Sequence, residues 1–164
     1  MKNSYRNKLF LFICSGCGLG LLPIAPGTWG TLLGVLIHIS VVFLLPPHLK
    51  MPVMVSSFLL VCILNILLAP WAERYWASTD PKRFVIDEVA GYMVIPLLFH
   101  SGSLWQIVVY GFILFRIFDI IKVPPADIVE KRLKAGWAIL LDDIVSGVYA
   151  VGVIYILLHL GVIR

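Results

Sequence analysis

The chain has 164 residues, which suggests one domain over residues 1–164, and hydrophobic residues make up 60% of it against only 13% charged residues. Ordinary globular domains are roughly half apolar and a quarter charged, so a soluble domain of this size is excluded and lipid must solvate much of the surface. The net charge of +4, without interleaved soluble structure, suggests anionic lipid headgroups rather than nucleic acid as the partner.

A backbone inside a membrane satisfies its hydrogen bonds only in a helix bundle or a closed barrel. The apolar runs of this chain are long and do not alternate as the strands of a barrel do. The sequence therefore predicts an all-α, polytopic membrane bundle with about four to five membrane-embedded helices.

The N-terminal segment, residues 1–27, resembles a signal peptide in its basic start and short apolar stretch. Glycines interrupt that stretch, and Pro23 and Pro26 follow where a cleavage region would be small and uninterrupted, so we favour a segment that stays in the protein. Cys14 and Cys17 form a C-x-x-C pattern, but no second pair is present to complete a zinc site.

Apolar stretches that cross or nearly cross the membrane follow one another along the chain. The sequence predicts such helices at residues 31–45, 53–71, 89–99, 104–121 and 144–163. A full span needs about 20 residues, so the third stretch must begin earlier, tilt little, thin the bilayer or be re-entrant.

Five crossings place the N-terminus and residues 72–88 and 122–143 on one side of the membrane. Eleven of the thirteen Lys and Arg residues then lie on that side, and only Lys50 and Arg164 lie opposite. This bias predicts that the first side is cytoplasmic. All nine acidic residues fall there too, which the bias does not require, and this suggests that one face carries the chemistry.

Three charged clusters stand at the cytoplasmic ends of the apolar stretches. They are Asp87-Glu88, then Arg116 with Asp119 and Lys122, and finally Asp142-Asp143. A charge at the bilayer centre costs ~3 kcal/mol on insertion scales, and less near the interface. Such residues need partners, a metal ion or a water-filled pocket.

The middle cluster has two readings that its spacing does not separate. Arg116, Asp119 and Lys122 are three apart and alternate in sign, so on a helix they are neighbours. They form either a structural ladder of ion pairs or a metal-binding carboxylate between two phosphate-binding cations.

The first and third clusters share a pattern of two acids followed, after small or apolar residues, by Gly91 or Gly147. Asp87 and Asp142 could be helix caps favoured by the macrodipole. Alternatively, the glycines allow close helix approach beside the carboxylates. Five carboxylates from three helix ends repel one another unless a cation lies among them, and hard oxygen ligands with basic neighbours suit Mg²⁺ bridging to a phosphate.

The loop of residues 23–31 offers a further anion site, because Gly27 and Thr28 precede an apolar helix and expose backbone N–H groups. A plain helix entry, with Thr28 or Thr31 as the N-cap, is the alternative. The remaining charged loop residues, Asp80, Asp127, Glu130, Lys131, Arg132 and Lys134, are expected to form a headgroup-facing surface.

Several phosphatase chemistries are absent from the sequence. No cysteine is followed by five residues and an arginine, no Asp-x-Asp motif is present, and Walker and dinucleotide glycine motifs are missing. The four histidines lie away from the acids by this topology. The remaining mechanism is a metal-activated water that attacks phosphorus.

These residues resemble the phosphatidylglycerophosphatase A family over nearly the whole chain, from about Leu19 to the C-terminal helix. The stretches that carry the resemblance are residues 20–30 (GLLPIAPGTWG), Asp87-Glu88, residues 115–119 (FRIFD), Lys122 and residues 141–147 (LDDIVSG). The family commonly has Lys-Pro-x-Pro, whereas this chain reads Lys122-Val123-Pro124-Pro125.

The resemblance implies a Mg²⁺-dependent, multi-pass enzyme of the bacterial inner membrane. It would remove the terminal phosphate of phosphatidylglycerophosphate at the cytoplasmic face and give phosphatidylglycerol. Our hypothesis assigns metal binding or water activation to Asp87, Glu88, Asp119, Asp142 and Asp143, with one acid of each adjacent pair touching the metal. Arg116 and Lys122, with Thr28 and the Gly27 N–H, would bind the phosphate.

Two other classes of function remain open. A small transporter would use the clustered intramembrane charges as a path, although such a protein should carry polar groups on both sides of the membrane. A non-catalytic scaffold would use the charges only as ion pairs. The sequence leaves a homo-oligomer possible.

Overall fold

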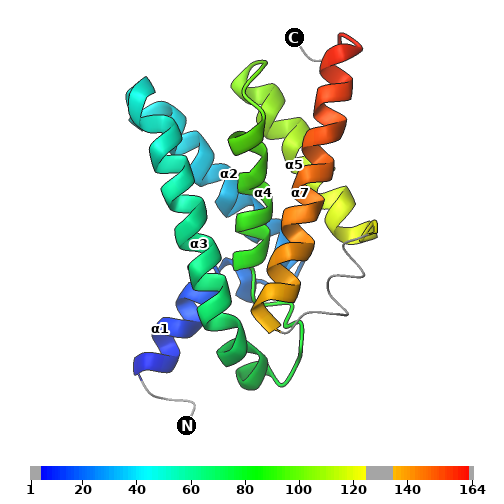
Figure 1. Ribbon diagram of the computed structural model, residues 1–164. Coiled ribbons are helices and arrows are strands. Elements are labelled where there is room, and N and C mark those ends of the chain that lie inside the picture. The colour runs from blue at the N-terminus through cyan, green and yellow to red at the C-terminus, as the bar shows by residue number, and fades with distance from the viewer. Residues whose placement is uncertain (1–4, 125–134, 163–164) are drawn as a thin grey trace.

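In the computed structural model, which describes residues 5–124 and 135–162, all regular structure is helical (Figure 1). The helices are α1 (Tyr5–Cys14), α2 (Pro26–Leu44), α3 (Pro47–Trp76), α4 (Ile86–Leu98), α5 (Leu104–Ile121) and α7 (Ala135–His159), with a short 3-10 turn at Leu19–Leu21. Within these residues α2, α3, α5 and α7 are long and apolar enough to cross a membrane. The predicted all-α membrane bundle is confirmed.

Prolines set the ends of α2 and α3. α2 begins at Pro26 rather than at residue 31, because proline is tolerated in the first turn, where its missing N–H has no intrahelical partner. Leu45 is extended before Pro46 and ends α2. α3 then begins at Pro47 and passes through Pro52 and Pro70, so it is longer at both ends than the predicted 53–71.

The prediction that Asp87 and Asp142 are helix caps is wrong for both residues. Val85 precedes α4 as its N-cap, and Asp87 lies in the first turn with Glu88, where the macrodipole favours acids. α7 begins at Ala135 rather than at residue 144. Asp142 is therefore not a cap, because Asp142 and Asp143 lie about two turns inside the helix.

A buried asparagine of α3 stabilises the first turn of α7, which begins earlier than predicted. Asn65 of α3 is fully buried, and its Nδ2 donates to the carbonyl oxygen of Gly136 at 2.8 Å. A Cβ atom at Gly136 would lie only 3.0 Å from the Cα of Ile66, so glycine lets the two backbones approach. A side-chain hydrogen bond between helices is a stabilising contact where water is absent.

α4 lies at the centre of the bundle, between α3 and α7 in Figure 1, and packs against α2, α3, α5 and α7. Every residue from 86 to 96 is buried except Glu88, which is half-buried. Its 13 residues cover about 20 Å, less than the ~30 Å of bilayer hydrocarbon. So short a helix is possible at this depth because other helices, rather than lipid, surround it.

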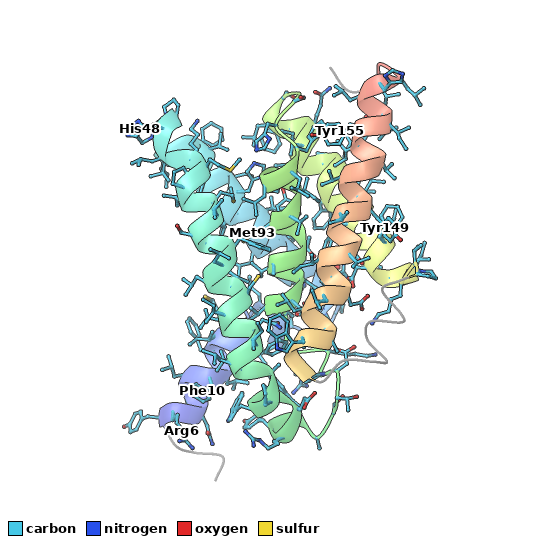
Figure 2. The ribbon with its side chains drawn as sticks, viewed as in Figure 1. Arg6, Phe10, His48, Met93, Tyr149 and Tyr155 are labelled. Atoms are coloured by element: carbon cyan, nitrogen blue, oxygen red, sulfur yellow. The ribbon has the colours of Figure 1, made fainter. Side chains whose placement is uncertain are left out.

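Aromatic and basic side chains mark one end of the bundle. The ring of Phe10 on α1 packs edge-on against Trp71 of α3 at 5.4 Å between centroids, and Trp71 stacks on Tyr75 at 4.7 Å. Figure 2 shows Arg6 and Phe10 at this end and His48 at the opposite end. Such aromatic groups are typical of a membrane–water interface.

α4 and α7 come into direct backbone contact at a pair of glycines. A Cβ atom at Gly147 would collide with the carbonyl oxygen of Gly91, and a Cβ atom at Gly91 would lie 2.8 Å from the carbonyl oxygen of Asp143. The two glycines thus allow the close helix approach that their positions beside the carboxylates predicted.

Replacing Gly147 by alanine should force α7 away from α4. Overpacking of this kind costs about 1–3 kcal/mol, so Gly147→Ala should lower the thermal unfolding midpoint in detergent by about 2–12 °C. Gly152→Ala on the same helix is the matched control, because a Cβ atom at Gly152 meets nothing within 4 Å. Equal midpoints for the two variants would show that the glycine contact does not hold the helices together.

Candidate active site

The three charged clusters meet at a small cavity of about 80 Å³ at the start of α4. Its lining comprises Asp80, Asp87, Glu88, Asp119, Lys122, Ile139, Asp142 and Asp143. All five carboxylates that the sequence singled out therefore contribute to one site, from α4, α5 and α7. Its place at one end of the bundle agrees with the expectation that a single face carries the charge.

Three of these carboxylates are close enough to share one metal ion. One oxygen from each of Asp87, Glu88 and Asp143 lies within 4.8 Å of the other two. Both acids of α4 belong to this group, although we expected one from each adjacent pair. In the first turn of a helix, side chains lean toward the N-terminus, so both can reach past the end of α4.

Arg116 and Lys122 each form an ion pair with a carboxylate of the site. Arg116 Nη1 lies 2.5 Å from Asp119 Oδ2 on α5, which is the first step of the predicted ladder. Lys122 Nζ lies 2.8 Å from Asp142 Oδ2 on α7. Lys122 ends α5 in a left-handed conformation, with φ of 51°.

Buried polar atoms at the site have no partner among residues 5–124 and 135–162. They include Asp87 Oδ1, Glu88 Oε2 and Asp143 Oδ2, and also the donor Arg116 Nε. A buried carboxylate oxygen without a partner costs free energy. The three oxygens suit a divalent cation that prefers oxygen ligands, such as Mg²⁺, and the Arg116 Nε–H suits an anion.

The acids at the start of α4, outside the four helices long enough to cross the membrane, carry shifted pKa values. Burial is the main factor that raises the pKa of Asp87, and the carboxylates of Asp80 and Asp119 raise it further. Burial also raises the pKa of Glu88, with Asp87 as the next factor. Both shifts have the sign expected for a crowded acidic cluster whose charge is not fully compensated.

The start of α2 closes another side of the site. A Cβ atom at Gly27 would overlap Glu88 Oε1 and lie 2.9 Å from Arg116 Nη1, so glycine leaves space there for the ends of these two side chains. Thr28 is half-buried and is not part of the cavity lining given by the described residues. The alternative prediction that Thr28 or Thr31 is the N-cap of α2 is wrong, because Ala25 occupies that position. The Thr31 hydroxyl instead donates to the carbonyl oxygen of Gly27 at 2.9 Å.

Asp80 is the site residue that sequence reasoning set aside as headgroup-facing surface. It lies in the loop between α3 and α4 and lines the cavity beside Asp87. Its only signal in the sequence was its nearness to Asp87 along the chain. The other residues assigned to that surface, Asp127, Glu130, Lys131, Arg132 and Lys134, lie outside the described residues.

Comparison with known proteins gives one family and several relatives. Residues 12–158 match the model of a family described as phosphatidylglycerophosphatase A. A candidate phosphatidylinositol-3-phosphatase of Bacteroides thetaiotaomicron is 36% identical over 85% of this chain and 87% of its own length. The phosphatidylglycerophosphatases A of Haemophilus influenzae (32% identical, 94% and 91% covered) and Escherichia coli (33%, 88% and 80%) are also similar. No solved structure matches.

Asp143→Asn should change how the protein responds to a metal ion. In excess chelator, removing one of three crowded charges should raise the thermal unfolding midpoint by about 2–4 °C, since relief of ~1 kcal/mol is expected. Added Mg²⁺ should stabilise the wild type by mass action and leave the variant nearly unchanged.

Glu73→Gln is the matched control, because Glu73 lies at the same end of the bundle on α3 but not among the cavity-lining residues. That variant should keep the full Mg²⁺ response. An equal Mg²⁺ response in Asp143→Asn would remove Asp143 from the metal ligands.

Proposed function

Because the chain belongs to the phosphatidylglycerophosphatase A family, we propose that this membrane phosphatase removes the terminal phosphate of phosphatidylglycerophosphate and gives phosphatidylglycerol. The observation that carries the proposal is the cluster of Asp87, Glu88 and Asp143, whose buried oxygens lack partners, beside Arg116 and Lys122. A cluster that served only as ion pairs would match each acid with a cation.

The metal ion of the proposed reaction is Mg²⁺, held by Asp87, Glu88 and Asp143. Support comes from the donor set, which is all carboxylate, and from oxygens within 4.8 Å of one another. When bound, Mg²⁺ supplies a Lewis acid for the phosphate and lowers the pKa of water near the phosphorus. Asp119 and Asp142, which were also assigned from the sequence to metal binding or water activation, line the same cavity.

Arg116 and Lys122 bind the phosphate and offset the charge that develops on its oxygens during transfer. Asp119 and Asp142 hold the two cations in place through their ion pairs. Arg116 still has a buried Nε–H without a partner among the described residues, and an arginine presents several N–H donors to one anion. Gly27 lets the start of α2 pass close to the Arg116 and Glu88 side chains, and its N–H with Thr28 offers further contacts to the phosphate.

The proposed site faces the cytoplasm from a bacterial inner membrane, so that the acyl chains remain in the bilayer while the headgroup enters the cavity. Support comes from the charge distribution. Six described cations, namely Arg6, Lys8, Arg74, Lys82, Arg83 and Lys122, lie in the terminal turns or loops at the end of the bundle that carries the site. Lys50 lies at the other end, and such a bias is typical of the cytoplasmic side.

A phosphorylated inositol lipid is a second candidate substrate. The Bacteroides thetaiotaomicron relative, named for phosphatidylinositol 3-phosphate, supports it. Both lipids present a phosphate monoester on a polyol headgroup, and the described cavity is lined by groups for metal and phosphate rather than for one polyol. The transporter alternative is less well supported, since the described acids gather at one end of the bundle rather than along a path.

The detergent-purified protein should release phosphate from phosphatidylglycerophosphate with Mg²⁺, lose this activity in excess chelator and regain it when Mg²⁺ is restored. Phosphatidylinositol 3-phosphate and phosphatidic acid with the same acyl chains complete the substrate set. A kcat/KM for the inositol lipid above that for phosphatidylglycerophosphate would overturn the first assignment in favour of the second.

The Asp119→Asn variant is the matched inactive protein in that assay. It keeps the size of the side chain but loses the charge that holds Arg116, so kcat should fall at least about 100-fold while the protein remains folded, since transition-state charge is then poorly stabilised. Full activity in this variant would show that Asp119 is not needed for the reaction. Release unaffected by chelator would refute the metal proposal.

Sealed membrane vesicles test the side of the membrane. Inside-out vesicles should hydrolyse substrate added to the medium, and right-side-out vesicles should do so only after detergent opens them. The reverse order would place the acidic cavity on the outer face.

A further inference from the structure

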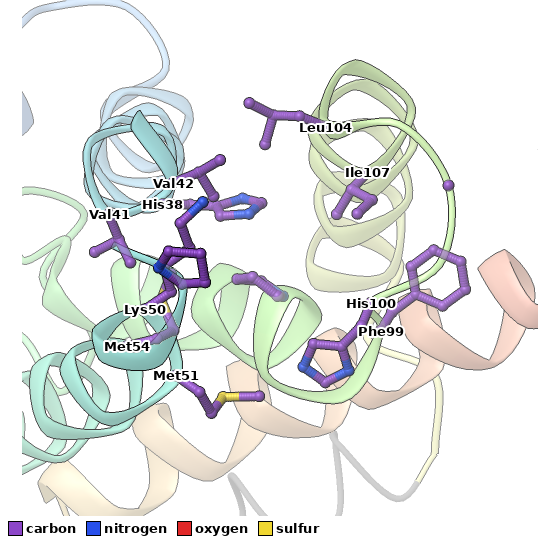
Figure 3. Close-up of a pocket in the computed structure, with 13 residues that line it drawn as sticks. His38, Val41, Val42, Lys50, Met51, Met54, Phe99, His100, Leu104 and Ile107 are labelled. Atoms are coloured by element: carbon purple, nitrogen blue, oxygen red, sulfur yellow. The ribbon is translucent and has the colours of Figure 1, made fainter. Parts of the chain in front are cut away.

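A second and larger cavity, of about 390 Å³, lies at the opposite end of the bundle (Figure 3). It is formed where α2 and α4 end and where α3 and α5 begin. His38 on its wall is eleven residues along α2 from Gly27, which corresponds to about 16 Å along the helix axis. This cavity is therefore separate from the acidic site.

Most of the cavity wall is apolar. Val41, Met54, Phe99 and Ile107 contribute to it from four different segments of the chain. Methionine side chains adapt their shape to flexible apolar groups. The wall thus suits a hydrocarbon chain better than a compact polar solute.

The polar groups of the cavity are all basic or neutral. They are Lys50, His38 and His100, and Figure 3 shows the three side chains around the same space. No carboxylate belongs to the lining among the described residues. An ammonium group without an acid beside it favours a negatively charged ligand.

His38 is held in the cavity wall by burial and by a hydrogen bond. It is only 4% exposed in the interior of α2, and its Nδ1 lies 3.1 Å from the hydroxyl of Tyr92, a fully buried residue of α4. This bond fixes the imidazole while its ring lines the cavity (Figure 3). An ionisable side chain at membrane depth commonly marks a functional site.

We propose that this cavity binds an anionic phospholipid from the membrane leaflet that faces it. The headgroup phosphate would lie by Lys50 and His100, and an acyl chain would lie along Met54 and Ile107. A ligand that is apolar along most of its length and negative at one end matches this wall, which joins apolar side chains to Lys50 and His100. The site is independent of the proposed phosphatase reaction.

Lipid binding to the full-length protein in detergent can be measured by native mass spectrometry. The probes are dioleoyl phosphatidylserine and dioleoyl phosphatidylcholine, neither of which is a substrate or product of the proposed reaction. The wild type should bind the anionic lipid more tightly, and Lys50→Gln should weaken that binding about fivefold, the effect of one lysine near a membrane surface. Binding of phosphatidylcholine should change little.

His48→Gln is the matched control, because His48 lies in the same first turn of α3 but does not line the cavity. Val42→Trp, which fills the cavity from α2, should abolish binding of both lipids at this site. All three variants should keep the cooperative thermal unfolding transition of the wild type in detergent, which serves as the test of folding.

Equal affinity of the wild type for the two lipids would overturn the proposal, as would Lys50→Gln or Val42→Trp variants that bind phosphatidylserine like the wild type. Because the readout is binding, a failure of the phosphatase assay would leave this result interpretable, and a failure here would leave the phosphatase assignment intact.

Discussion

The acidic site depends on one contact, the meeting of the α4 and α7 backbones at Gly91 and Gly147. Each glycine faces the other helix where a Cβ atom would collide with it. The contact lies about one turn from Asp87 and Asp143, so it sets the separation of carboxylates that would otherwise repel one another. Dispersion contacts between closely packed helices supply the attraction that opposes this repulsion.

The same contact explains why the two cations do not simply neutralise the cluster. Arg116 and Lys122 approach from α5 and from its end, and each meets the acid on its own side. The three remaining carboxylates form the cluster of Asp87, Glu88 and Asp143, and no ion pair within 4.0 Å joins them to a cation among the described residues. A site that keeps unsatisfied buried charge gives up stability for a ligand, as functional sites commonly do.

Much of this arrangement follows from local features of the sequence. The ends of α5 coincide with the predicted 104–121, because Ser103 and Gln106 form a capping box and Lys122 adopts the left-handed conformation that ends a helix. The start of α7 was missed, because it depends on Asn65 of α3, which is distant along the chain. The sequence predicts that the clusters meet, because all of them lie on one side of the membrane. It does not predict that Asp143 rather than Asp142 lies next to the acids of α4, or that Asp80 lines the cavity. Both depend on how the helices pack. The roles of these residues in binding metal and phosphate remain predictions.

Because α4 is short and enclosed by other helices, its position should depend little on the thickness of the surrounding bilayer. Bilayers differ in hydrocarbon thickness, and a helix in contact with lipid adapts by tilting. α2, α3, α5 and α7 all present large apolar side chains outward and would take up such a mismatch, whereas α4 is buried among them and is in backbone contact with α7 at the glycines. The acids at the start of α4 should therefore keep their position next to Asp143 when the thickness of the membrane changes. An enzyme whose product alters the lipid mixture would keep this carboxylate cluster together as that mixture changes.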